Sequence, residues 1–135
     1  MALFVDTSVW SLALRRDSAP EEPEVQRLRD ALRGGESIHT AGIVLQELLQ
    51  GCRGPKAWER IVERFRALPL LVPGRDDYVK AAELRNKCRQ HGVQVGTINA
   101  LLAQLCVSRN LTMLSTDQDF NHIADWTPLQ LWRRS

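Results

Sequence analysis

Two short apolar runs end abruptly in acidic residues, and they constrain the fold more than any other feature of this sequence. Residues 2–5 (ALFV) run into Asp6, and residues 111–115 (LTMLS) run into Thr116 and Asp117. Runs that are apolar on both sides, without strict alternation, are typical of strands buried in a parallel sheet. The two runs therefore predict buried parallel strands with acids at their carboxyl ends.

Segments with helical spacing of apolar residues separate these strands from others. Helices are predicted through residues 10–14, 24–33, 42–53, 58–65, 76–90 and 97–109, and further short strands near 37–39, 70–72 and 129–131. Residues 17–23 predict a loop and a helix start, and Thr40 is a candidate N-cap for the helix that follows it. Trp10 and Trp58 lie on apolar helix faces and are expected in the core or at an interface.

The alternation of strands and helices predicts an α/β fold with three layers, α/β/α, around a central, mainly parallel sheet. The chain has 135 residues, the size of one domain, so residues 1–135 are expected to form a single domain. Hydrophobic residues make up 44% of the sequence, which excludes a disordered chain. No apolar run reaches the roughly 20 residues that a membrane helix needs, so no membrane partner is expected.

Ligands of open α/β sheets collect at the carboxyl ends of the strands, which is where the acids of this chain are predicted to lie. Asp6 and Asp117 follow two strands directly, Asp119 comes two residues later, and Glu47 sits on the flank of an apolar helix face. Carboxylates that face one pocket repel each other unless a cation lies between them. Oxygen ligands of this kind favour Mg²⁺ or Mn²⁺ over zinc, and such a site suits phosphoryl chemistry.

Each acid also has a purely structural interpretation. Asp6 could cap the helix that follows it, and Glu47 could pair with an arginine. Asp117 and Asp119 could form an Asx turn, with Phe120 as part of the core. The order of the motifs along the chain, rather than any single acid, favours a functional site.

In this order the sequence resembles the PIN-domain nucleases, and among them the VapC-type toxins of toxin–antitoxin pairs. The matching segments are 5–10 (VDTSVW), 43–50 around Glu47, 96–103 (GTINALLA) and 114–120 (LSTDQDF). The resemblance implies a PIN-like fold and a Mg²⁺- or Mn²⁺-dependent endoribonuclease that hydrolyses RNA phosphodiester bonds and is neutralised by a cognate VapB-like antitoxin. It also implies a homodimer or a toxin–antitoxin hetero-oligomer.

The resemblance places catalysis and metal binding on a set of acids and one amide. These positions are Asp6, Glu47, Asn99 and Asp117, with Asp119 as an accessory metal ligand. It further implies that the Thr7 and Thr116 hydroxyls orient these carboxylates or water molecules on the metal.

Asn99 departs from the family pattern, which has an aspartate after Gly-Thr-Ile. An amide keeps the shape of the side chain but loses its charge, so a second metal is expected to bind more weakly and activity to be reduced. Three explanations are open: an engineered inactivation, a naturally degenerate site, or an amide that leaves residual activity. The alternative function is a non-catalytic PIN-like module that binds RNA or an antitoxin.

Other features bear on the partner and the compartment. Residues 80–91 hold four Lys or Arg side chains and His91 against the single acid Glu83, which predicts either a surface for the RNA backbone or a solvated helix face. Three widely spaced cysteines predict free thiols in a reducing cytoplasm. The N-terminus lacks the basic region of a signal peptide, which agrees with a cytoplasmic location.

Overall fold

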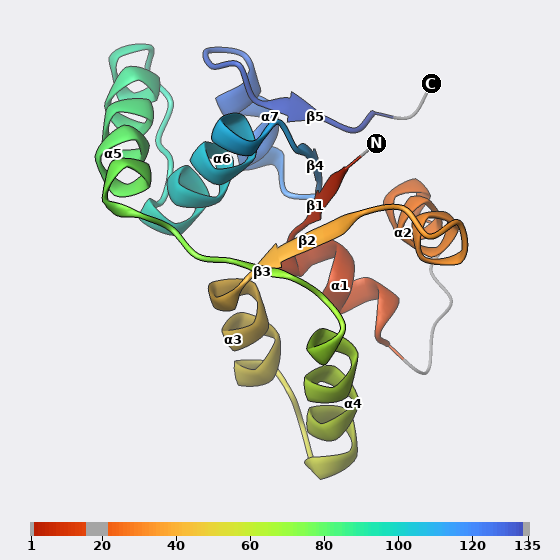
Figure 1. Ribbon diagram of the computed structural model, residues 1–135. Coiled ribbons are helices and arrows are strands. Elements are labelled where there is room, and N and C mark those ends of the chain that lie inside the picture. The colour runs from red at the N-terminus through yellow and green to blue at the C-terminus, as the bar shows by residue number, and fades with distance from the viewer. Residues whose placement is uncertain (1, 16–21, 134–135) are drawn as a thin grey trace.

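The computed structural model describes residues 2–15 and 22–133 and shows a five-stranded, all-parallel sheet in the order β3-β2-β1-β4-β5 (Figure 1). The strands are β1 (Leu3–Val5), β2 (Ile38–Ala41), β3 (Leu70–Leu71), β4 (Thr112–Leu114) and β5 (Gln130–Leu131). The helices are α1 (Thr7–Ala13), α2 (Pro23–Arg33), α3 (Gly42–Gln50), α4 (Pro55–Arg66), α5 (Arg75–Gln90), α6 (Thr97–Arg109) and α7 (Gln118–Ala124).

Helices cover both faces of the sheet. In Figure 1, α1, α3 and α4 lie on one side of the strands, and α5, α6 and α7 lie on the other. The fully buried β1 segment Leu3–Val5 lies in the middle of the sheet, as its unbroken apolar sequence predicts. The predicted three-layer α/β/α fold is confirmed.

The chain order makes the boundary between β1 and β4 a topological switch point. From β1 the chain proceeds to β2 and β3 toward one edge of the sheet, whereas from β4 it proceeds to β5 at the other edge. Neighbouring strands whose connections leave in opposite directions open a crevice at their carboxyl ends, and ligands of α/β proteins bind there. The fold therefore directs attention to the residues that follow β1 and β4.

One local prediction is wrong, one helix was missed, one prediction is narrowed, and one cannot be assessed. Thr40 lies inside β2 and the N-cap of α3 is Ala41, because the strand continues two residues past His39. Helix α7 was not predicted, since only seven residues separate Asp117 from Asp125. Of the two places expected for Trp58, the core is excluded, because the residue is 49% exposed, and an interface remains the prediction. Most of the predicted loop at 17–23 lies outside the described residues.

The buried tryptophan of α1 joins two helices. Trp10 is 1% exposed, and its ring centroid lies 5.0 Å from that of Phe65 in α4. None of the described helices is long and apolar enough to cross a membrane.

The two tryptophans provide a matched test of this packing. Trp10→Ala should lower the free energy of unfolding by about 3–5 kcal/mol, because it leaves a cavity between α1 and α4. Trp58→Ala should lower it by less than about 1 kcal/mol, because the indole is half exposed. Urea unfolding measures both, and equal losses would contradict the described packing.

Candidate functional site

The carboxyl ends of β1 and β4 bring Asp6 and Asp117 to the same edge of the sheet. Val5 is paired with Leu114, and the Asp6 backbone N–H donates to the Leu114 carbonyl over 3.2 Å. After each strand the chain leaves the sheet and enters a helix. Asp6 is the N-cap of α1, and Asp117 is the N-cap of α7. The first predicted element of the site, two strand-end aspartates at one edge, is present.

Asp6 is a buried carboxylate held by two serine hydroxyls. Only 5% of the residue is exposed. Ser8 Oγ donates to one carboxylate oxygen over 2.6 Å, and Ser115 Oγ donates to the other over 2.9 Å. Burial raises the pKa of Asp6 to about 6; the two serine hydrogen bonds oppose this shift and the nearby Asp117 charge adds to it. The side chain makes no capping hydrogen bond of ordinary geometry to α1, although the nearby backbone N–H of Val9, in the first turn of that helix, lowers the pKa of Asp6.

The same two serines connect the ends of the two strands. Ser115 Oγ accepts a hydrogen bond from the Asp117 backbone N–H over 2.9 Å, and Ser8 Oγ accepts one from the Thr116 backbone N–H over 3.0 Å. Each hydroxyl therefore joins Asp6 to the turn after β4. The sequence reasoning did not identify Ser8 or Ser115, although each stands two residues from an aspartate, a spacing that favours local hydrogen bonds.

Glu47 approaches the site from α3. Its Oε1 accepts a hydrogen bond from Thr7 Oγ1 over 2.8 Å, so the residue after Asp6 fixes its position. Among the described residues, no arginine pairs with Glu47. The expected orienting role of Thr7 matches this contact. Thr116, by contrast, reaches the network through its backbone N–H and makes no side-chain hydrogen bond to a described residue.

Asn99 lies in the first turn of α6 and joins two acids of the site. Its Nδ2 donates to Asp117 Oδ2 and to Asp119 Oδ2, each over 3.3 Å. Asp117 Oδ1 in turn accepts from the Asp119 backbone N–H over 2.9 Å, which caps α7. The Asx-turn interpretation of Asp117 and Asp119 is therefore present, and it coexists with a position of Asp117 facing Asn99.

All five predicted site residues gather around this edge of the sheet, in two connected halves. One half contains Asp6 and Glu47, and the other contains Asn99, Asp117 and Asp119. Their oxygen donors suit a hard cation such as Mg²⁺ or Mn²⁺. In the described ranges 2–15 and 22–133, however, no three acidic, histidine or cysteine side chains converge on one point as a ready metal cluster.

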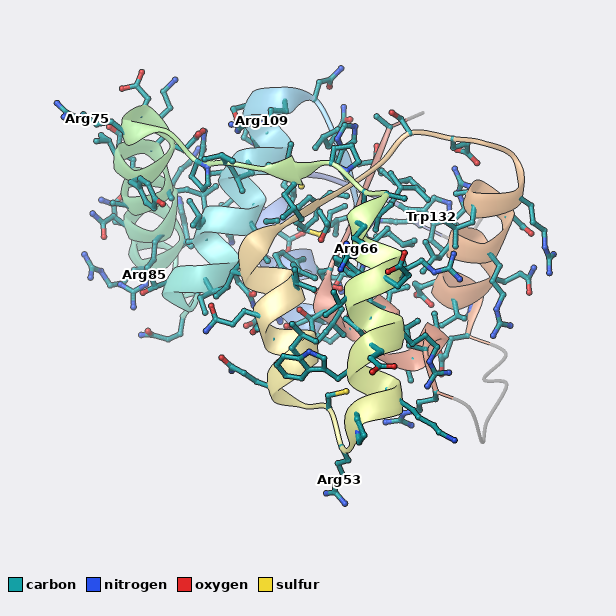
Figure 2. The ribbon with its side chains drawn as sticks, turned by 60° about the horizontal axis from the view of Figure 1, so that its bottom comes forward. Arg53, Arg66, Arg75, Arg85, Arg109 and Trp132 are labelled. Carbon is teal, nitrogen blue, oxygen red and sulfur yellow. The ribbon has the colours of Figure 1, made fainter. Side chains whose placement is uncertain are left out.

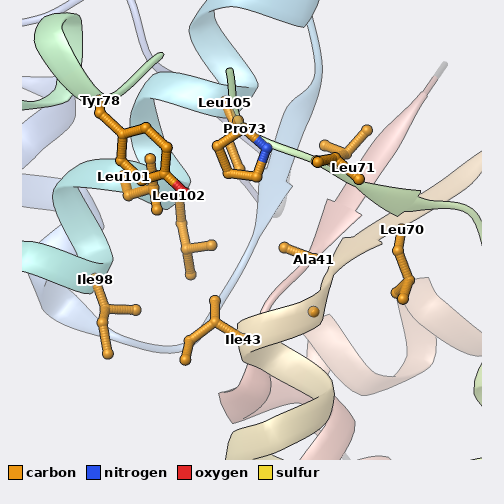
Figure 3. Close-up of a pocket in the computed structure, with 12 residues that line it drawn as sticks. Ala41, Ile43, Leu70, Leu71, Pro73, Tyr78, Ile98, Leu101, Leu102 and Leu105 are labelled. Carbon is orange, nitrogen blue, oxygen red and sulfur yellow. The ribbon is translucent and has the colours of Figure 1, made fainter. Parts of the chain in front are cut away.

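Of the two largest hollows given by the described residues, the polar one borders the acids and the apolar one does not. A polar cavity of about 450 Å³ is lined by Ser115, Thr116 and Asp117 together with residues of α2, α7 and β5. A second hollow, of about 440 Å³, is lined by apolar side chains of β3, α3 and α6 with Tyr78 of α5 (Figure 3). The described residues that line the second hollow include no acid, so it is not the site of the chemistry.

The basic run of residues 80–91 lies on α5, where Figure 2 shows Arg85 on the outer side of the molecule. Arg85 is half-buried, and its Nε donates to the Val95 carbonyl over 2.7 Å. His91 stacks on Trp126 with ring centroids 3.8 Å apart. The other three cationic side chains, Lys80, Lys87 and Arg89, are exposed. Arg85 and His91 therefore make contacts within the fold, whereas the three exposed cations are available to a polyanion.

Comparison with known proteins identifies the family. The model of the PIN domain matches residues 3–125, which include every predicted site residue. The chain belongs to the PIN domain family. A comparison with curated proteins gave no match.

Solved structures show the same PIN fold. VapBC2 from Rickettsia felis, bound to a fragment of promoter DNA, matches over 100% of both chains with a TM-score of 0.77 and 17% identity. VapBC-1 from nontypeable Haemophilus influenzae matches 98% of this chain and 97% of its own, with a TM-score of 0.74 and 17% identity. The sarcin–ricin loop cleaving toxin VapC20 of Mycobacterium tuberculosis matches 96% and 99%, with a TM-score of 0.68 and 19% identity.

The raised pKa of Asp6 makes the stability of this PIN domain depend on pH. The folded carboxyl has a pKa of about 6 against an ordinary value of 3.8. The protonated carboxyl therefore adds to the free energy of unfolding in full below about pH 4, and this stabilisation is lost as the pH rises through about 6. At roughly 1.4 kcal/mol per pH unit, the total loss should be about 3 kcal/mol.

Urea unfolding in EDTA between pH 4 and pH 7.5 measures this loss. Asp6→Asn should remove it, whereas Asp76→Asn, which changes an exposed acid of α5, should retain it. Parallel pH curves for the unaltered chain and Asp6→Asn would show that Asp6 ionises at its ordinary pKa.

Proposed function

We propose that this chain is a metal-dependent endoribonuclease toxin of the VapC type, weakened by the amide at Asn99. The observation that carries the proposal is the pair of strand-end acids, Asp6 and Asp117, joined through Ser115 at the switch point of a PIN fold. Glu47 and Asp119 add negative charge on either side of this pair. The cleavage named for the similar VapC20 supports RNA as the substrate.

The acids suit a cation even though no three of them converge in the described part of the chain. Mg²⁺ commonly keeps several water molecules and binds proteins through only one or two carboxylates. Asp6 and Asp117 are the pair that would hold it, with Glu47 and Asp119 at the margins and Asn99 as a neutral neighbour. When bound, Mg²⁺ or Mn²⁺ supplies a lower pKa for attacking water and stabilises charge on the phosphate.

The residues of the chain itself position this chemistry. Ser8 and Ser115 fix both oxygens of Asp6, so that the carboxylate is pre-oriented and costs little reorganisation during the reaction. Thr7 fixes Glu47 at the rim of the site. The RNA backbone approaches over exposed cations such as Lys87 and Arg89 of α5, which attract phosphates without reading sequence.

A VapB-like antitoxin is the proposed partner, in a homodimer or a toxin–antitoxin hetero-oligomer. The VapBC complexes that share this fold support the assignment. We assign residues 1–135 to one nuclease domain, of which the family match covers 3–125. A cytoplasmic location agrees with the three free thiols, Cys52, Cys88 and Cys106.

A second candidate is a PIN module that binds RNA or antitoxin without cutting. The hydrogen bonds of Asn99 to both Asp117 and Asp119 favour it, because these carboxylates are partly satisfied without a cation. Turnover that depends on a metal distinguishes the two functions.

Restoring the carboxylate should restore activity. Asn99→Asp should increase the rate of RNA cleavage in Mg²⁺ or Mn²⁺ by roughly 100- to 1,000-fold, the scale of one preorganised electrostatic contact. The measurement compares both chains on a labelled RNA pool, with EDTA as the metal-free control.

A third variant controls for a contaminating nuclease. Asp117→Asn in the Asn99→Asp background removes one of the strand-end acids and should return cleavage to the EDTA level. Absence of metal-dependent cleavage by both the unaltered chain and Asn99→Asp would exclude the enzyme and favour the binding module.

A further inference from the structure

The amide of Asn99 uses both of its N–H groups on two different carboxylates. Its Nδ2 lies 3.3 Å from Asp117 Oδ2 and 3.3 Å from Asp119 Oδ2. A carboxamide nitrogen has two donors, so one hydrogen serves each acid. The opposite orientation of the amide would place Oδ1 against two carboxylate oxygens, which fixes the assignment. We call Asn99, Asp117 and Asp119 the amide clamp.

The remaining contacts of the clamp also satisfy the acids without a metal. Asp117 Oδ1 accepts from the Asp119 backbone N–H over 2.9 Å, and both residues lie at the N-terminus of α7. The Asp117 backbone N–H is bound by Ser115 Oγ over 2.9 Å. Each oxygen of Asp117 therefore has a hydrogen-bond donor inside the chain.

An aspartate at position 99 would reverse this balance. It would remove both donated hydrogen bonds and bring a third carboxylate to within contact of two others, where like charges disfavour ionisation unless a cation neutralises them. The folded chain would then need a bound ion to stabilise the carboxylates that the amide now stabilises with its two hydrogen bonds.

We propose that the Asn99 carboxamide occupies the place of a cation between Asp117 and Asp119, so that this half of the site is closed in the metal-free protein. Cation binding is thereby confined to the half of the site that contains Asp6, and the chain takes one ion where its Asn99→Asp variant takes a second. The inference rests on the proposed function for the identity of the ion, but the clamp itself is a property of the metal-free chain.

Thermal unfolding in EDTA tests the clamp without any metal or RNA. Asn99→Asp should lower the Tm by an amount on the order of 5 °C. Asn86→Asp makes the same chemical change at an exposed position of α5 and should leave the Tm close to that of the unaltered chain. The double variant Asn99→Asp with Asp119→Asn exchanges the amide and the acid across the clamp and should recover most of the lost Tm.

Mn²⁺ binding, measured by calorimetry and by the electron paramagnetic resonance of free Mn²⁺, tests the second half of the proposal. Asn99→Asp should bind one additional ion and should bind Mn²⁺ roughly 10- to 100-fold more tightly. Asn86→Asp and the double variant should bind as the unaltered chain does. Equal Tm values for Asn99→Asp and Asn86→Asp in EDTA, or equal Mn²⁺ stoichiometry and affinity for the unaltered chain and Asn99→Asp, would overturn the proposal.

The RNA assay separates this outcome from failure of the proposed function. Suppose that no variant cleaves RNA, but that Asn99→Asp has a lower Tm in EDTA and binds one more Mn²⁺ ion than the unaltered chain. The clamp is then supported and the nuclease assignment fails. If Asn99→Asp cleaves RNA but is as stable in EDTA as Asn86→Asp, the nuclease assignment is supported and the clamp is overturned.

Discussion

The parallel pairing of β1 with β4 is the constraint on which the site depends. Because Val5 lies opposite Leu114, the residues that follow both strands must emerge together at the switch point of the sheet. Asp6 and Asp117 are thus held close by backbone hydrogen bonds that do not involve either carboxylate. Burial and like charge make this proximity unfavourable, as the raised pKa of Asp6 shows, and the rest of the site compensates for it.

Compensation comes from neutral hydrogen-bond donors, which differ between the two halves of the site. Ser8 and Ser115 satisfy Asp6 and are also bound to the backbone after β4. Asn99 satisfies Asp117 and Asp119 from the other side. Each serine hydroxyl has one hydrogen and leaves the other lone pairs of Asp6 to a cation, whereas the amide places both of its hydrogens between two acids. The first half is therefore the one that remains suited to an ion.

The sequence predicts the sheet and the meeting of Asp6 with Asp117, because uninterrupted apolar runs specify buried parallel strands and parallel strands end at one edge. Both serines were missed for different reasons. The Ser8 bond to Asp6 spans two residues and has a local signal, whereas the Ser115 bond to Asp6 depends on strand register, which no local pattern encodes. The two tryptophans show the same limit: Trp10 and Trp58 both lie on apolar helix faces, but only Trp10, whose ring packs against Phe65 of α4, is buried. The local sequence makes Thr40 resemble a helix N-cap, but its pairing with Leu70 of β3 places it inside strand β2.

The position of Asn99 explains why one residue can change the chemistry without changing the fold. It lies in the first turn of α6, at the half-exposed end of a helix whose buried residues, such as Leu102 and Leu105, supply the packing. An acid or an amide fits the same space there, because the two side chains have the same shape. Backbone pairing sets the positions of β1 and β4. Exchanging the amide for an acid therefore alters the charge of the site and leaves its geometry in place. Stability without a metal and affinity for a metal are consequently opposed at this single position.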